Sequence, residues 1–300
     1  MLPFRKKKKE APTCGGTTWS RDENAPRVIV SRDMTFFHVS TRLNWTVPRD
    51  PREEERMLFC VTAYAAPADR GTFLFLEAAS PEWLGRREFS WALVREDPFP
   101  VLAEFAAACD LAKENGLCSR THGLPENFGG SIDVRYRSGE RISVSDNRSP
   151  LLSQEDGRKT AEIFRRLMAG ERVPLPDPAG LSEICFSEDR RDGGYTRCVC
   201  GIRPDGTAIN RKRRCYSGEK AFDSEKSVDA STVASIREVL TKKGVPAWSG
   251  LPDNGFGSEK KSITLRYGTG EEITVLNDRL LPDQLRGGFF DIELELTAKH

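Results

Sequence analysis

The chain repeats itself, and this duplication is the feature that most constrains its fold. Residues 131–144 (SIDVRYRSGERISV) align with residues 262–275 (SITLRYGTGEEITV), and eight of the fourteen positions are identical. Just upstream, residues 123–127 (GLPEN) match residues 250–254 (GLPDN). Two blocks in the same order indicate an internal duplication, in which each copy is one supersecondary unit.

The repeated block predicts a β-hairpin in each copy. In the first copy, Ile132, Val134 and Tyr136 alternate with polar residues, and the alternation resumes after a turn that contains Gly139. The second copy shows the same pattern around Gly270. Period-two alternation is typical of half-buried strands, and glycine tolerates the positive φ of a tight turn.

An amphipathic helix and a run of strands are expected before each hairpin. The helices should span residues 101–112 and 233–240, the second with N-cap candidates from Asp229 to Ser231 and a stop at Gly244. A closing helix is expected at residues 157–168 and 283–297, although residues 289–296 alternate and also fit a strand. The expected strands are 28–31, 35–46, 57–64, 72–78 and 88–94 in the first copy, and 183–188, 195–202, 207–216 and 220–225 in the second.

Strands that cluster along the chain, instead of alternating with helices, predict an α+β fold. We expect two tandem repeats, each an antiparallel β-meander with a helix, a β-hairpin and a closing helix. The predicted limits are a disordered basic tail at residues 1–26, repeat unit 1 at 27–169, a Pro-rich linker at 170–180 and repeat unit 2 at 181–300.

The charge balance disfavours a nucleic-acid or anionic-membrane partner. Lys and Arg total 46 against 45 Asp and Glu, and five of the basic residues lie in the terminal run Arg5 to Lys9. The basic run 211–214 (RKRR) reads as an exposed or edge strand, with nucleic-acid contact as the alternative. No stretch of eighteen apolar residues and no secretory leader pattern is found, so we expect a cytoplasmic protein that does not enter a membrane.

A helix, the linker 245–252 (VPAWSGLP), a Tyr-containing hairpin with a glycine turn and a closing proline (Pro150 and Pro282) follow one another in this chain. This arrangement resembles uncharacterised cytosolic proteins of gut Firmicutes, which carry a duplicated helix and Tyr/Gly hairpin unit. The resemblance covers residues 98–168 and 230–297. It implies the architecture and a bacterial origin, and it implies no activity.

Candidate catalytic and metal-binding groups are few. The histidines are His38, His122 and His300, and a dyad of Cys118 with His122 is conceivable. Eight cysteines are too sparse for a disulfide scaffold, and we expect buried free thiols. We expect no metal site, with one zinc alternative on four cysteines that fall within a short stretch: Cys185, Cys198, Cys200 and Cys215.

Two hypotheses for function follow. The first is a non-enzymatic binding or scaffolding module with a protein or small-molecule partner and no cofactor. The second is an enzyme whose site lies between the repeats and uses acidic and Arg/Tyr groups. The matched residues available to either are Glu126, Asp253, Arg135, Arg266, Tyr136 and Tyr267. The repeated Arg-Tyr pairs also fit plain strand packing, with tyrosine inward and arginine outward.

Overall fold

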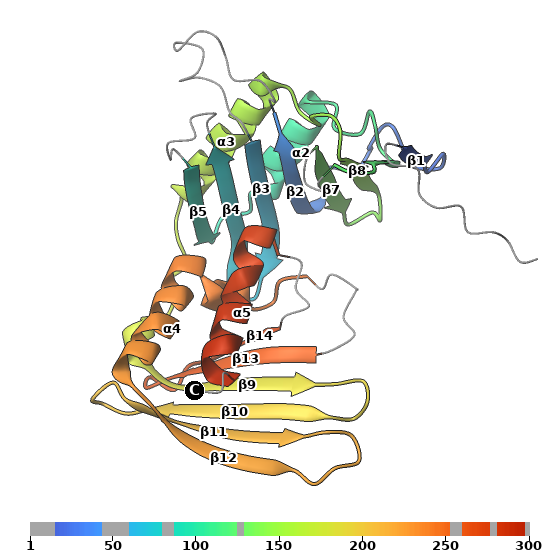
Figure 1. Ribbon diagram of the computed structural model, residues 1–300. Helices are drawn as coiled ribbons and strands as arrows, with labels where there is room; N and C mark the ends of the chain where they lie inside the picture. The colour runs from blue at the N-terminus through green and yellow to red at the C-terminus, as the bar shows by residue number, and fades with distance from the viewer. Residues whose placement is uncertain are drawn as a thin grey trace, which may run out of the picture. The chain divides into compact units, whose positions relative to one another are not determined.

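A computed structural model describes residues 16–43, 60–79, 87–124, 129–252, 260–276 and 281–297. These residues form two mostly antiparallel β-sheets together with α-helices, so the predicted α+β class is confirmed (Figure 1). The chain divides into two compact units. Unit 1 comprises Met1–Thr62, Ala78–Arg87 and Pro100–Ala161, and unit 2 comprises Ala63–Glu77, Glu88–Phe99 and Glu162–His300.

The larger sheet has eight strands in the order β1-β6-β8-β7-β2-β3-β4-β5. In its first five strands the pairings are antiparallel, except for the short parallel contact between β6 and β8. The strands are β1 (Thr17–Arg21), β2 (Met34–Arg42), β3 (Cys60–Ala68), β4 (Gly71–Ala79), β5 (Arg87–Val94), β6 (Leu117–Thr121), β7 (Gly130–Tyr136) and β8 (Arg141–Asp146).

The smaller sheet has six antiparallel strands in the order β12-β11-β10-β9-β13-β14. Figure 1 shows α4 and α5 on one side of this sheet. The strands are β9 (Leu181–Asp189), β10 (Tyr195–Ile202), β11 (Ala208–Cys215), β12 (Phe222–Val228), β13 (Lys260–Tyr267) and β14 (Glu272–Leu276).

The helices lie close to the predicted ranges. They are α2 (Phe99–Ala108), α3 (Gln154–Met168), α4 (Ala230–Lys243) and α5 (Asp283–Thr297), with short 3-10 turns η1 (Pro178–Gly180) and η2 (Val245–Trp248). The caps predicted for α4 are confirmed: the Asp229 side chain accepts from the Thr232 N–H, and the helix ends at Gly244. None of the helices in the described ranges is long and apolar enough to cross a membrane.

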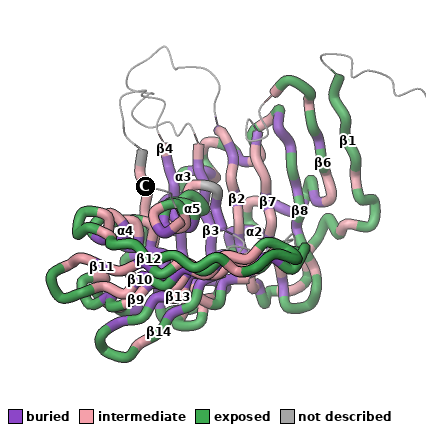
Figure 2. The backbone as a smooth tube through the Cα atoms, turned by 60° about the horizontal axis from the view of Figure 1, so that its bottom comes forward, coloured by how far each residue is buried: buried purple, intermediate pink, exposed green. Residues whose placement is uncertain are grey.

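Both predicted hairpins are confirmed, as β7–β8 and β13–β14. Their turns contain Gly139 at φ 90° and Gly270 at φ 86°, in the left-handed region that glycine adopts without strain. The alternating apolar residues of all four strands are buried. Figure 2 shows how such buried stretches, seen in purple on β3 and β4, contrast with the exposed strand β1.

In unit 1, the core forms where helix α2 meets the strands. The ring of Phe105 on α2 packs edge-on against Phe37 of β2, with 6.2 Å between the ring centroids. Val134 of β7 and Ile142 of β8 are fully or almost fully buried in the same unit. The period-two pattern of the sequence thus becomes one apolar sheet face.

In unit 2, helix α5 covers the six-stranded sheet. Phe289 of α5 packs edge-on against Phe186 of β9 at 6.4 Å between centroids. Leu285, Phe289, Ile292 and Leu296 recur at helical spacing and are buried, which decides residues 289–296 in favour of helix over strand. Every second residue in this segment is apolar, but the residues that are buried follow the three- and four-residue spacing of a helix.

Several expectations are wrong. Residues 28–31 are not a strand, and Val28 and Val30 are largely exposed. Strand β1 lies inside the segment expected to be a disordered tail, where it pairs with β6, a strand that the sequence pattern does not predict. The basic run 211–214 lies on β11, where Arg211 and Arg213 are exposed as expected, but β11 is not an edge, because it pairs with both β10 and β12.

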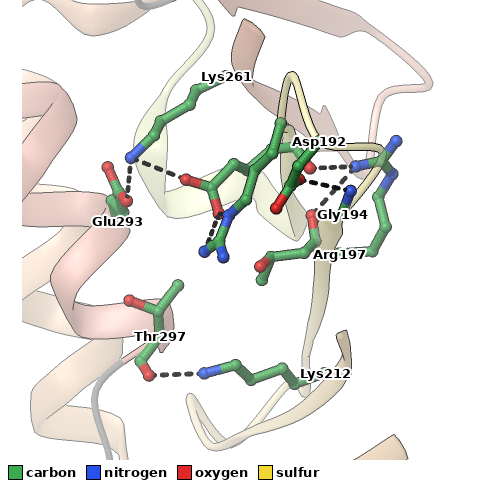
Figure 3. Close-up of polar contacts among 10 residues, drawn as sticks. Asp192, Gly194, Arg197, Lys212, Lys261, Glu293 and Thr297 are labelled. Carbon is green, nitrogen blue, oxygen red and sulfur yellow. Dashed lines mark hydrogen bonds and ion pairs between the residues drawn. The ribbon is translucent and has the colours of Figure 1, made fainter. Parts of the chain in front are cut away.

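The charges of this basic run are used within the fold. Arg211 forms an ion pair with Glu225 of β12 at 3.0 Å. Lys212 turns inward and its Nζ donates to the Thr297 carbonyl at the end of α5, 2.8 Å away (Figure 3). A lysine at the last carbonyls of a helix satisfies orphan acceptors and complements the helix dipole.

A partly buried charge network joins α5 to the sheet. Lys261 Nζ of β13 lies 2.7 Å from Glu293 Oε1 of α5 and 3.2 Å from Glu188 Oε1 of β9 (Figure 3). The Arg190 guanidinium reaches the second Glu188 oxygen at 3.0 Å. Burial by itself raises the pKa of Glu188, but the hydrogen bonds from Lys261 and Arg190 outweigh it and hold this pKa below 4.5. Burial by itself lowers the pKa of Lys261, but its two carboxylate partners outweigh burial and raise this pKa above the ordinary lysine value.

We expect Lys261→Met to lower the free energy of unfolding by about 2 kcal/mol, because it leaves two partly buried carboxylates without their shared cation. Glu225→Gln, which breaks an exposed pair, should cost less than about 1 kcal/mol in the same denaturant unfolding measurement.

Glu188 has a lowered pKa in the folded state, so its contribution to stability is fully present above the ordinary glutamate pKa. That contribution is lost as the pH falls through the lowered pKa. Denaturant unfolding from about pH 6 to pH 3 should therefore show a flatter acid dependence for Glu188→Gln than for the wild type. Equal slopes would contradict the network.

Candidate functional site

The site begins with a close approach between α4 and β5. Helix α4 ends at Gly244, whose φ of 67° and ψ of 32° place it in the left-handed region. A side chain there would meet Trp91 of β5, since a Cβ on Gly244 would lie 2.5 Å from the indole ring. The Trp91 indole Nε1 donates to the Lys242 carbonyl at 3.1 Å. Glycine thus lets the end of α4 rest against β5, and residues 245–248 continue as a buried turn.

Trp91 and its neighbour Phe89 stand on a support of buried rings. Trp91 stacks on Phe73 of β4 with centroids 6.3 Å apart and 25° between the ring planes. Phe89 packs edge-on against Phe75 of β4 at 5.1 Å. Phe73 and Phe75 have no exposed surface, so they fix the two half-buried rings in place.

These residues line a pocket of about 600 Å³ that we call the β5 pocket. Three cations complete its wall: Lys242 and Lys243 from the end of α4, and Arg172 from the segment after α3. The lining residues are Phe89, Ser90, Trp91, Arg172, Lys242 and Lys243. None of the six is acidic.

Two cations of the β5 pocket, Lys243 and Arg172, bond to neutral groups. Lys243 Nζ lies 5.3 Å from the centroid of the Phe89 ring and donates to the Gln284 carbonyl at 2.9 Å. Arg172 Nε donates to the Met168 carbonyl at 3.3 Å. Among the described residues, no carboxylate lies within ion-pair distance of Arg172, Lys242 or Lys243.

Two acidic residues next to the β5 pocket in the chain, Glu88 and Glu171, already have arginine partners. Glu88 accepts three hydrogen bonds from Arg165, at 3.2, 2.9 and 2.5 Å, and Glu171 pairs with Arg95 at 2.8 Å. A neighbouring pocket of about 380 Å³ between α4 and α5 is lined by acids as well as by the two lysines. The β5 pocket is therefore the part of this surface where positive charge is concentrated.

The repeated Arg-Tyr pairs lie elsewhere. Tyr136 and Tyr267 are buried, and burial raises the pKa of Tyr267 to about 12 and that of Tyr136 in the same direction. Arg135 bonds to Asp133 at 2.8 Å, and Arg266 bonds to Glu272 at 2.7 Å and to Glu183. The tyrosines thus point inward and the arginines form ion pairs on the other face, as plain strand packing requires. Glu126 and Asp253 lie outside the described residues.

The four cysteines of the zinc alternative do not converge. Cys198 and Cys200 are buried on the face of β10 that the helices cover. Cys185 is paired with Val199 and Cys215 with Tyr195, which places both thiols on the opposite face. No group of three or more metal-binding side chains occurs in the part of the chain that the structure describes.

The geometry supports neither a reactive thiol on β10 nor the Cys118–His122 dyad. Burial raises the pKa of Cys198 and of Cys200 to about 11, so both thiols are protonated near neutral pH. Cys118 lies in strand β6 and His122 follows the end of that strand. Four residues along extended chain span about 13 Å, too far for a dyad.

The sequence does not point to the β5 pocket. Its pattern identifies Lys242 and Lys243 only as complements of the helix dipole, and Trp91 only as a strand residue. The weak signal is the order Phe-Ser-Trp on β5, which puts two aromatic rings on one strand face beside a strand end. No protein-family model matches the chain, and a search of the curated proteins finds no match either.

We expect Gly244→Ala to destabilise the protein by about 3 kcal/mol, because it combines a left-handed φ with a contact against Trp91. Gly270→Ala is the matched control, since Gly270 has φ 86° but no atom within 4 Å of the position that a Cβ would occupy; it should cost about 1 kcal/mol. Adding Trp91→Ala to Gly244→Ala should give a smaller loss than the sum of the single variants in denaturant unfolding. Additive losses would show that the two residues do not meet.

Brief alkylation of the native protein with iodoacetamide at about pH 8 should modify exposed Cys118 and leave Cys198 and Cys200 unmodified. The two buried thiols, with pKa values of about 11, hold on the order of a thousandth of their population as thiolate at this pH. Mass mapping of the labelled peptides measures the result. Rapid labelling of Cys198 or Cys200 would contradict their inert role.

Proposed function

We propose that this protein is a non-enzymatic binding module of two related α+β repeats, which holds an anionic partner in the β5 pocket. One observation carries this proposal. Three cations without a carboxylate partner among the described residues surround two aromatic rings that are fixed from behind. Such a lining suits a ligand with negative charge next to an apolar or planar group.

The strand order of the two sheets supports the duplication. In the larger sheet, β8-β7-β2-β3-β4-β5 places the hairpin beside the first of four strands that follow in chain order. In the smaller sheet, β14-β13-β9-β10-β11-β12 has the same arrangement. A helix precedes each hairpin and another follows it. Strands β1 and β6 are then additions to the first copy.

The chemistry of the β5 pocket favours binding over catalysis. Ser90 is its one hydroxyl, and that hydroxyl donates to the Met168 sulfur at 3.5 Å, with no base among the lining residues. In the enzyme alternative, the site groups that the structure describes are the Arg-Tyr pairs, whose arginines form ion pairs and whose tyrosines pack in the core.

We further propose a cytoplasmic location, which the free thiols of the described cysteines support.

The Trp91 indole N–H resonance tests this proposal directly. It is assigned by comparison with Trp91→Phe in proton–nitrogen spectra of the full chain. Titration with three anionic probes (oligoglutamate, oligothymidylate and inorganic polyphosphate) should shift it for at least one of them. The doubly reversed variant Lys242→Glu/Lys243→Glu should weaken that binding at least about tenfold, and added salt should weaken it too.

Lys220→Glu/Lys226→Glu is the control, because it makes the same charge change at exposed positions on and beside β12. It should leave the affinity within about twofold. If no probe moves the Trp91 signal, or if both double variants weaken binding equally, the β5 pocket is not a binding site.

A further inference from the structure

Strand β5 is an edge of the eight-stranded sheet, and among the described residues a backbone bridge is found at only one end of that edge. Residue Val94 forms a single antiparallel bridge with Arg172. Two backbone hydrogen bonds flank this bridged pair: the Val173 N–H donates to the Leu93 carbonyl at 2.8 Å, and the Arg95 N–H donates to the Glu171 carbonyl at 3.1 Å. The backbone groups of Leu93 and Arg95 therefore point out of the sheet.

Backbone direction alternates along a strand, so Phe89 and Trp91 also direct their N–H and C=O groups outward. Outside the regular strand ladders, no backbone hydrogen bond to Phe89 or Trp91 occurs in the described ranges. An edge with unpaired donors and acceptors is a template for one more strand.

The β5 pocket lies along this open part of the edge. The side chains of Phe89 and Trp91 face α4, as the contacts with Lys243 and Lys242 show. Ser90 points the other way, toward Met168 of α3. Since all of these residues line one pocket, the pocket reaches both faces of β5 at its edge.

We propose that an extended, acidic segment of a partner protein binds here as an additional strand beside β5. Its backbone pairs with the outward groups of Phe89 and Trp91. Alternate side chains point to the two faces of β5: apolar groups lie against the aromatic rings, and carboxylates reach Lys242 and Lys243 on one face and Arg172 on the other. This inference rests on the proposed function and names the partner of the same pocket.

The charge of the β5 pocket selects this occupant. A second copy of the chain would bring its own Arg172, Lys242 and Lys243 to the shared edge, and like charges would repel. A nucleic acid would satisfy the cations, but it would leave the peptide-type donors and acceptors of Phe89 and Trp91 without a matching backbone. An acidic peptide has carboxylates for the cations and a backbone that matches the donors and acceptors of the strand edge.

Selection from a displayed library of random peptides tests the inference, with the full-length protein as target and Lys242→Glu/Lys243→Glu as counter-target. Enriched peptides should carry Asp or Glu together with aromatic or aliphatic residues. The best peptide is then synthesised with one backbone amide N-methylated at a time, over about eight positions. Methylation at every second position should weaken binding at least about tenfold, and methylation at the positions between should have little effect.

Three outcomes would overturn the inference: enriched peptides without acidic residues, loss of binding without period two in the N-methyl series, and a library that yields no binder. If oligothymidylate or polyphosphate still moves the Trp91 resonance in that case, the binding function stands and only the peptide partner is wrong. If no anionic probe moves it, both proposals fail together.

Discussion

The contact between Gly244 and the indole ring of Trp91 is the interaction on which the β5 pocket depends. Helix α4 needs a residue that accepts a left-handed conformation at its end and that leaves room for an aromatic ring. Because glycine meets both needs, the carbonyl of Lys242 accepts the indole N–H, and the two lysines reach the edge of β5. A larger residue would move the helix end and its charges away from the strand.

The three cations of the β5 pocket, Arg172, Lys242 and Lys243, have two physical effects. A sheet edge with open hydrogen-bonding groups is prone to pair with other edges, and lysine or arginine beside it discourages pairing between copies. Positive charge at that edge also favours an approaching strand that is acidic. Protection of the edge and selection of a partner thus follow from one arrangement of charge, and the supporting rings of Phe73 and Phe75 keep the apolar part of the surface rigid.

Local features of the fold were predictable from the sequence. Alternation around Gly139 and Gly270 predicted the two hairpins, and Asp229 and Gly244 predicted the ends of α4. The helix and strand patterns of residues 289–296 conflicted, and burial of Phe289 and Leu296 against the sheet resolves them. Each of these depends on residues that are close in the chain.

The pocket depends on contacts between distant residues, and these left little signal. Trp91 and Lys242 are 151 positions apart, and nothing in either segment indicates the other. The position of β5 at a sheet edge follows from the strand order, which alternation does not encode. Strands β1 and β6 were missed for a related reason: their residues are mostly exposed and show no clear apolar alternation.

Amide hydrogen exchange at β5 tests the central claim most directly. In the free protein, the outward N–H groups of Phe89 and Trp91 should exchange quickly, while the inward N–H of Ser90 is protected by the sheet. Saturation with a selected acidic peptide should slow exchange at Phe89 and Trp91 and leave Ser90 unchanged. Unchanged exchange at Phe89 and Trp91 in the saturated complex would contradict strand addition at this edge.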